Sequence, residues 1–170
     1  MIETRNKTKN ILVSLAFIAF GGPGILAVYL PAWITRWRIP QDGWGWRSLG
    51  VILIVIGLIP LGESIVRFVR VGQGTLVPTN PTETLVASGF YRYVRNPMYL
   101  GVLSLIAGQT ALFQSWALCK YLATVAVGFH LFVVLYEEPT LRQKYGESYV
   151  SFRRNVPRWL PRRRPWFAAE

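Results

Sequence analysis

The stretch GFYRYVRNPMYLGVL, residues 89–103, decides how this chain folds. It holds two arginines and three tyrosines, and an apolar run begins directly after the pair Asn96-Pro97. Asparagine is a favoured N-cap residue, and proline is favoured at the first helical position. The stretch therefore predicts a helix that begins at Pro97 and is capped by Asn96, with polar and aromatic residues around its N-terminal end.

The composition of the whole chain indicates a membrane protein. Of its 170 residues, 52% are hydrophobic and only 16% are charged, above the apolar share of a soluble domain. One cysteine and one histidine, Cys119 and His130, exclude a disulfide framework and Cys/His zinc sites, so no metal is expected. The net charge of +11 would suit nucleic acid. The basic residues nevertheless cluster at the ends of apolar segments, which is typical of a membrane surface, so no nucleic-acid partner is expected.

Four apolar segments can be compared with the roughly 20 residues that a membrane-spanning helix needs. They are Ile11–Ile34 with a kink at Gly21–Gly24, Ser48–Val69, Pro97–Leu118, and the short segment Tyr121–Tyr136. The last two have almost no connection, so we expect a tight antiparallel hairpin. No small-x-small cleavage site follows the first run, which is therefore expected to be a retained span. The sequence predicts an all-α integral membrane protein with about four transmembrane helices.

The distribution of lysine and arginine predicts the topology. Three lie in the N-terminal tail, four between Arg67 and Arg95, and eight from residue 137 onward, whereas the other two connections hold four. The positive-inside rule places both termini in the cytoplasm, in an inner membrane of bacterial or archaeal type. One domain, 1–170, then consists of two N-terminal spans (1–70), a cytoplasmic loop (71–96), a helical hairpin (97–136) and a cytoplasmic tail (137–170).

The tail is predicted to form an amphipathic helix. Its apolar stripe follows helical spacing, and its basic residues lie off the stripe. The stripe consists of Leu141, Tyr145, Tyr149, Phe152 and Val156. The run RNVPRWLPRRRPWF that ends the tail is typical of an anchor in the headgroup layer, so membrane lipids are expected partners.

An acidic pair, Glu137-Glu138, follows the fourth apolar segment. At a helix C-terminus two carboxylates oppose the helix dipole and repel each other, so they need a cation nearby. Either Arg92 and Arg95 supply it, or a cationic ligand does. His130 precedes Glu137 by seven residues on nearly the same helical face, and we expect it to be buried and hydrogen-bonded.

The remaining charged and glycine-rich motifs do not predict a catalytic site. Glu63 and Arg67 have the spacing of a helical ion pair at the end of the second span, which indicates a structural role. The runs GQG and GGPG match neither a phosphate-binding loop nor a dinucleotide fingerprint. The chemistry expected of a soluble enzyme is absent from the sequence.

Two blocks of the chain resemble a known family. ETLVASGFYRYVRNPMYLG (83–101) and EEPTLRQKYGESYVSFRRNVPRWLP (137–161) are similar to the membrane methyltransferases related to isoprenylcysteine carboxyl methyltransferase and the phospholipid N-methyltransferases. The resemblance covers nearly half of the chain, from Thr84 to Pro161. The two blocks occur in the family's order, separated by a hairpin of matching length.

The resemblance implies methyl transfer from S-adenosylmethionine at the cytoplasmic membrane surface. By position, the implied cofactor contacts are Glu83, Thr84, Leu85, Val86, Tyr91, Asn96, Pro97, Met98, Tyr99 and Glu137. The tail would form the lid, and a lipid-side opening would admit a lipid-soluble or amphipathic acceptor. Arg95 is expected to orient the cofactor or the acceptor. If the acceptor is an amine or a thiol, His130 and Glu138 are the candidate bases.

Three positions depart from the family pattern. Asn96 and Glu83 replace family histidines, and Val133 stands where eukaryotic relatives carry an arginine assigned to the substrate's carboxylate. These departures leave open whether the acceptor reacts through oxygen, nitrogen or sulfur. The alternatives are a phospholipid amine N-methyltransferase and a non-catalytic membrane protein that binds lipids or a partner. The oligomeric state is left open as well.

Overall fold

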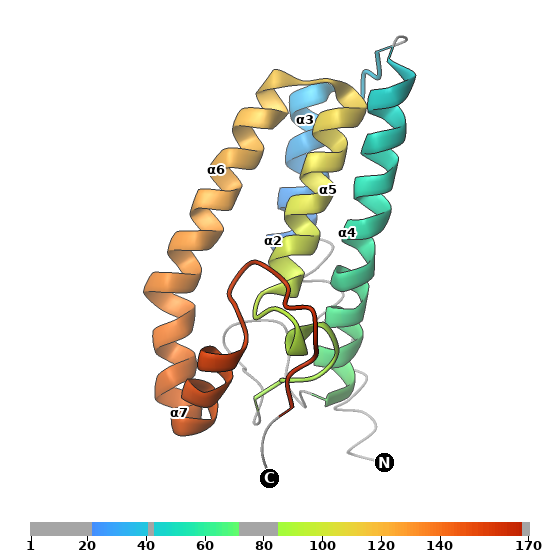
Figure 1. Ribbon diagram of the computed structural model, residues 1–170. Helices are drawn as coiled ribbons and strands as arrows, with labels where there is room; N and C mark the ends of the chain where they lie inside the picture. The colour runs from blue at the N-terminus through green and yellow to red at the C-terminus, as the bar shows by residue number, and fades with distance from the viewer. Residues whose placement is uncertain (1–21, 41–42, 72–84, 168–170) are drawn as a thin grey trace, which may run out of the picture.

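The computed structural model describes residues 22–40, 43–71 and 85–167, and all regular elements in these ranges are helical. Along the chain they are α2 (Gly22–Gly24), η1 (Ile25–Tyr29), α3 (Leu30–Thr35), α4 (Trp44–Val71), η2 (Gly89–Arg92), α5 (Pro97–Phe113), α6 (Trp116–Phe132), η3 (Val133–Glu137) and α7 (Glu138–Asn155). Figure 1 shows α5 between α4 and α6, with α7, residues 85–96 and the segment after α7 at the lower end of the bundle. The prediction of an all-α fold is confirmed for the described residues.

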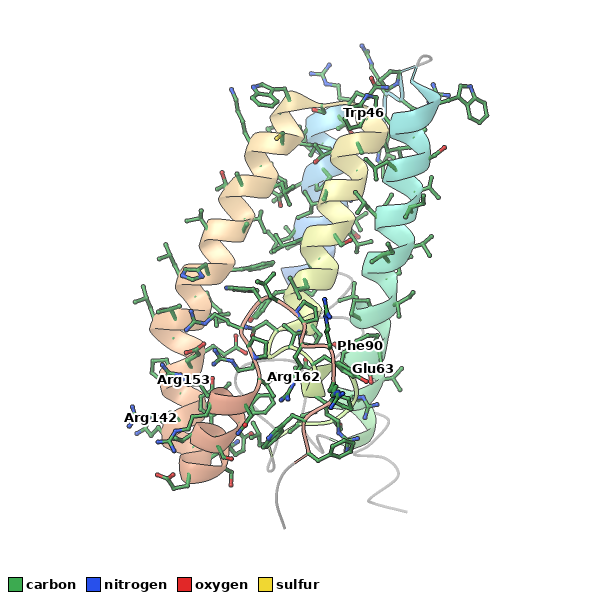
Figure 2. All side chains as sticks on the ribbon, viewed as in Figure 1. Trp46, Glu63, Phe90, Arg142, Arg153 and Arg162 are labelled. Atoms are coloured by element: carbon green, nitrogen blue, oxygen red, sulfur yellow. The ribbon has the colours of Figure 1, made fainter. Side chains whose placement is uncertain are left out.

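Two helical stretches are long and apolar enough to cross a membrane, Trp44–Ser64 and Trp116–Asn155. Two further apolar helices, Gly22–Thr35 and Pro97–Phe113, are shorter. Residues 11–21 of the first predicted span lie outside the described residues. The upper end of the bundle, where Figure 2 labels Trp46, carries exposed tryptophans of the kind found at membrane interfaces. They are Trp33, Trp37, Trp44, Trp46 and Trp116.

Helices α4 and α5 make a close contact through glycines. A Cβ on Gly50 would lie 2.7 Å from the carbonyl oxygen of Gly108, and one on Gly101 would lie 2.8 Å from that of Gly57. Small residues let two backbones approach in this way, as is common between membrane helices. The Ser104 hydroxyl also donates a hydrogen bond to the Leu53 carbonyl at 2.8 Å. The glycine spacing therefore fixes α5, and the site at its lower end, against α4.

The helix Gly22–Thr35 contains a π-helical turn, η1, two residues before Pro31. Proline has no N–H, so it cannot donate to the carbonyl four residues earlier, that of Ala27. The buried Gln109 side chain donates to this carbonyl at 2.7 Å, and the Tyr121 hydroxyl donates to the neighbouring Leu26 carbonyl at 2.9 Å. Side chains of α5 and α6 thus supply bonds to the backbone of η1.

The predicted hairpin is present, but its turn comes earlier than expected. Helix α5 ends at Phe113 and α6 begins at Trp116, so only two residues join them. Gln114 adopts a left-handed conformation (φ 48°), and the Ser115 hydroxyl caps α6 by accepting a hydrogen bond from the Leu118 amide. The predicted end of the third segment at Leu118 was wrong because the apolar residues after Gln114 and Ser115 already belong to α6.

The helix does not stop at the acidic pair, and this prediction was also wrong. From α6 it continues through the π-helical turn η3 into α7, so Glu137 and Glu138 lie inside a longer helix. Pro139 is tolerated because it falls in the first turn of α7, directly after the π turn. Within α7 the chain bends at Gly146, whose φ is 55° and ψ is −129°.

The apolar stripe of the tail forms a second core. Tyr149, Phe152 and Val156 are buried, and Leu141 and Tyr145 pack against them. The same cluster includes residues from the loop before α5 and from the end of the chain, namely Leu85, Ala87, Tyr91 and Trp166. The residues of the stripe thus pack against protein, and an amphipathic helix at a membrane surface stays a prediction.

Candidate functional site

At the lower end of the bundle, three arginines converge on one member of the acidic pair. Glu138 is 6% exposed, and Arg95 Nη1 donates to its Oε1 at 2.9 Å. Arg158 donates to both oxygens, from Nε at 2.6 Å and from Nη2 at 3.0 Å. Arg153 Nε lies 3.7 Å from Oε2.

This network more than balances the charge of Glu138. The carboxylate, which accepts two hydrogen bonds from Arg158, raises the pKa of that guanidinium above its usual value. Arg95 is one of the two cations expected beside the acidic pair, whereas Arg158 was not anticipated. Because both oxygens accept charged hydrogen bonds, the geometry favours a structural role for Glu138 over its predicted role as a base.

Glu137, the other member of the pair, has a different environment. The Tyr99 hydroxyl donates to its Oε2 at 2.8 Å. Within the described part of the chain, no arginine, lysine or histidine forms an ion pair with it. Tyr99 comes from the first turn of α5, so a half-buried carboxylate without a balancing cation lies beside the start of that helix.

Residues 156–167, which we call the strap, cross the start of α5 (Figure 1). Backbone hydrogen bonds tie the strap to the loop: Arg95 N to Pro157 O and Arg162 N to Tyr93 O, both at 2.9 Å. A third runs from Trp166 N to Arg92 O at 3.0 Å. Three backbone hydrogen bonds therefore hold the strap against residues 92–95.

Asn96 takes part in this attachment and not in capping. It occupies the N-cap position of α5, but its side chain makes no cap hydrogen bond and instead donates to the Arg158 carbonyl at 3.1 Å. The predicted start of the helix at Pro97 is confirmed, and the predicted side-chain cap is wrong. The reason is that the strap offers a carbonyl within reach. As a result, the first-turn amides of α5 have no side-chain acceptor from their own cap residue.

An aromatic group lies next to the Tyr99–Glu137 pair. Trp159 of the strap donates from Nε1 to His130 Nδ1 at 3.1 Å, and its ring centroid is 6.5 Å from that of Tyr99. On the other side, the Tyr99 and Phe129 ring centroids are 4.6 Å apart. These rings cover Tyr99 with polarisable faces that can accept a cation.

His130 is exposed in the structure, so the prediction that it is buried is wrong. It is nevertheless hydrogen-bonded, as expected. An indole N–H can only donate, so His130 Nδ1 must carry its lone pair and uses it for Trp159. The predicted role of His130 as a base therefore requires Trp159 to move first.

The other residues implied by the resemblance lie on several sides of this region. Val86, Asn96 and Pro97 are buried, Leu85 and Tyr91 pack on the tail cluster, and Met98 packs on the bundle core. Burial raises the pKa of the Tyr91 hydroxyl, which stays neutral and can act only as a hydrogen-bonding group. Glu83 and Thr84 lie outside the described residues.

The arrangement suits a ligand that carries both a positively and a negatively charged group. The unbalanced Glu137 carboxylate attracts a cationic group, and the uncapped first turn of α5 attracts an anionic one. In the described ranges, no group of three or more His, Cys, Asp or Glu side chains could hold a metal ion. Sequence reasoning missed Arg158 and Trp159, although the second block of the resemblance, which contains both, pointed to the strap.

Comparisons with known proteins agree on one family. The model of the family described as phospholipid methyltransferase matches residues 46–148. Protein-S-isoprenylcysteine O-methyltransferase B of Arabidopsis thaliana is 27% identical over 134 residues, covering 79% of this chain and 65% of the relative. The protein-S-isoprenylcysteine O-methyltransferase of Schizosaccharomyces pombe is 27% identical over 117 residues, covering 69% and 47%.

A rice relative matches to a similar extent. The probable protein-S-isoprenylcysteine O-methyltransferase of Oryza sativa subsp. indica is 27% identical over 133 residues, covering 71% of this chain and 64% of the relative. The chain thus spans less than two thirds of the length of these relatives. No solved structure gives a significant match to the chain.

Proposed function

The chain belongs to the phospholipid methyltransferase family, whose model matches more than half of it, and we propose that it is an S-adenosylmethionine-dependent methyltransferase. Its apolar helices and its family identify it as a membrane protein. The proposed acceptor is a lipid-soluble or amphipathic small molecule that reaches the site from the bilayer. The names of the relatives, which are isoprenylcysteine O-methyltransferases, support this class of acceptor.

The observation that carries the proposal is the contrast within the acidic pair. Glu138 is held by three arginines, whereas Glu137 has Tyr99 as its hydrogen-bond partner and no balancing cation in the described residues. A half-buried carboxylate is costly without a cation, so this position favours a positively charged ligand. S-adenosylmethionine carries an ammonium, a sulfonium and a carboxylate, which fits the donor and acceptor groups present.

The chain's own residues would bind and orient S-adenosylmethionine and would exclude water from the site. Glu137 and Tyr99 would hold the ammonium or the sulfonium, and the first-turn amides of α5 would hold the carboxylate. When bound, S-adenosylmethionine supplies an activated methyl group for in-line displacement by a nucleophile. Such a reaction needs mainly alignment and a dry site. Glu138 and its arginines would keep the strap, and with it Trp159, closed over Tyr99.

The acceptor is expected to present an uncharged nucleophile. Arg95, Arg153 and Arg158 all contact Glu138, so an acceptor carboxylate would have to compete with that side chain for them. Val133, at the position of the family arginine, is 1% exposed. A phospholipid amine is the second candidate, because the matching family is described by phospholipid methylation. It would react as the free amine after losing its proton.

Two measurements test the function. Calorimetry on the detergent-purified chain should detect binding of S-adenosylmethionine or its demethylated product; absence of binding at millimolar concentration would remove the enzyme hypothesis and leave a membrane lipid- or partner-binding protein. Transfer of a labelled methyl group, screened over a membrane lipid extract, thiols, phospholipid amines and prenylcysteine analogues, should then identify the acceptor.

The proposed topology has four spans with both termini in the cytoplasm of an inner membrane. The excess of lysine and arginine at the lower end supports it, since Figure 2 places Arg142, Arg153 and Arg162 there, opposite Trp46. Single cysteines placed near each terminus, in a Cys119→Ala background, should be labelled only after the membrane is permeabilised. Labelling of just one terminus from outside would contradict the topology.

A further inference from the structure

A second glutamate, Glu63 near the lower end of α4, has an unused buried oxygen. Its Oε1 accepts a hydrogen bond from Arg67 Nε, whereas Oε2 is buried and has no hydrogen-bond partner among the described residues. Buried polar atoms in proteins are nearly always hydrogen-bonded, and leaving one unpaired is costly. The ion pair alone, which the sequence predicted, therefore accounts for only half of this carboxylate.

The loop before α5 attaches Glu63 to the candidate site. Arg67 Nη1 donates to the Ser88 hydroxyl at 2.9 Å. The next residue, Gly89, adopts φ 57° directly against the ion pair, where any Cβ would collide with the Glu63 carboxylate. Figure 2 shows Glu63 next to Phe90 of the same loop. Glu63 thus lies beside the turn η2 that carries Tyr91.

Tyr91 connects the two acidic positions. Burial raises the pKa of its hydroxyl, a hydrogen bond with the buried Ser64 opposes that rise, and the nearby charges of Glu137 and Glu63 add to it. Ser64 is therefore already a partner of Tyr91, and among the described residues the unpaired polar atom in this group is Glu63 Oε2.

The charge balance at Glu63 indicates what it would bind. Glu137 has no balancing cation in the described part of the chain, whereas Glu63 is already paired with Arg67. Glu63 therefore offers a hydrogen-bond acceptor with little net charge, which suits a hydroxyl better than a cation. A carboxylate that accepts hydrogen bonds from sugar hydroxyls is a common arrangement in nucleotide-binding sites.

We propose that Glu63 is a ligand-binding residue of the same site and that its free oxygen accepts a hydrogen bond from a ribose hydroxyl of the adenosyl ligand. This inference rests on the proposed function. It gives the site two differently charged ends, with Glu137 for the cationic end of the ligand and Glu63 for its sugar. Tyr91 lies between them.

The test compares two ligands on the full-length protein in detergent. S-adenosylhomocysteine and its 2′,3′-dideoxy analogue are titrated into wild type and Glu63→Gln by calorimetry. In wild type, removal of the hydroxyls should weaken binding about tenfold, the loss expected for a hydrogen bond to a charged group. Glu63→Gln should weaken S-adenosylhomocysteine binding by about three- to tenfold and leave binding of the dideoxy analogue unchanged.

Arg67→Met is the matched control, because it breaks the same ion pair and leaves the Glu63 oxygen in place. If Glu63 serves only to hold the loop, Glu63→Gln and Arg67→Met will weaken both ligands alike, and the inference is overturned. Equal affinity of wild type for the two ligands would overturn it as well while leaving the proposed function intact. Failure of wild type to bind either ligand would instead refute the proposed function and the inference together.

Discussion

The two π-helical turns within the described residues have the same length and the same position relative to a proline, yet their surroundings differ. Turn η1 ends two residues before Pro31, and η3 ends two residues before Pro139. Around η1, side chains of α5 and α6 bond to backbone carbonyls inside the bundle. At η3, the turn leads to two carboxylates that face the start of α5 and the strap.

The difference shows how one backbone irregularity serves two purposes. At η1, Gln109 replaces a hydrogen bond that Pro31 cannot make, which restores the helix and joins it to its neighbours. At η3 the contacts within the described part of the chain balance only one of the two acids. Glu138 is paired with arginines, whereas Glu137 accepts a hydrogen bond from Tyr99. π turns often mark functional sites, and of these two turns η3 carries a charged side chain, Glu137, whereas η1 carries none.

The largest effect is expected at Glu138. Glu138→Gln removes the charge that holds three guanidiniums, two of them at hydrogen-bond distance, and should lower the free energy of unfolding by about 3–5 kcal/mol. Thermal unfolding in detergent measures this loss. The control is Arg153→Gln, which should cost less than about 0.5 kcal/mol, because that side chain is 49% exposed and 3.7 Å away. Equal losses of stability from the two changes would contradict the structural role of Glu138.

Glu137→Gln should affect binding and not stability. We expect the affinity for S-adenosylmethionine to fall at least about tenfold, or about 1.4 kcal/mol, because the cationic end of the ligand loses its counter-charge. The unfolding temperature should stay near that of wild type, since Tyr99 can donate to the amide oxygen. Glu147→Gln, the same change at an exposed position of α7, is the control. An unchanged affinity in Glu137→Gln would remove this residue from the site.

Gln109→Leu tests the structural turn. Loss of the bond to the Ala27 carbonyl should cost about 1–2 kcal/mol and leave ligand affinity unchanged. Pro31→Ala restores an N–H that can reach the same carbonyl, so the cost of Gln109→Leu should shrink in that background. A double-mutant cycle by thermal unfolding measures this coupling. Strictly additive effects would show that Gln109 does not replace the missing bond of Pro31.

The smallest effect is expected at the contact between Trp159 and His130. Trp159→Phe keeps the aromatic face beside Tyr99 and removes one hydrogen bond, so it should cost less than about 1 kcal/mol. His130→Ala removes the acceptor of the same hydrogen bond. If that bond is the main connection, the double variant should lose little more than the larger of the two single changes. A pH-dependent methyl-transfer rate that disappears only in His130→Ala would instead support the role of His130 as a base.

The helix starts and the apolar faces could be predicted because they depend on local chemistry. Pro97 begins α5 because its missing N–H and fixed φ suit that position, and the tail stripe is buried because its spacing follows the helix. The extent of α6 could not be predicted in this way. Acidic residues and Pro139 are both ordinary helix-end signals, and only the π turn allows the helix to continue through them.

The structure brings four of the predicted site residues together, since Arg95 contacts Glu138 and Tyr99 contacts Glu137. Their roles in a cofactor site stay predictions. The side chain of Asn96 does not cap its helix, and His130 is not buried, because both are hydrogen-bonded to the strap. No periodicity in the sequence indicates where a proline-rich strap without regular structure will lie.

By itself, the sequence determined which segments are apolar, where α5 begins and that an acidic pair faces a basic region. These features depend on residue type and spacing along a helix, which are local. Only the tertiary structure decided which carboxylate is neutralised, because Arg95, Arg153 and Arg158 come from a loop, from α7 and from the strap. Charge balance is a property of groups that meet in space. Two adjacent glutamates that look equivalent in the sequence therefore differ in the fold: Glu138 is paired with arginines, and Glu137 is a candidate ligand-binding residue.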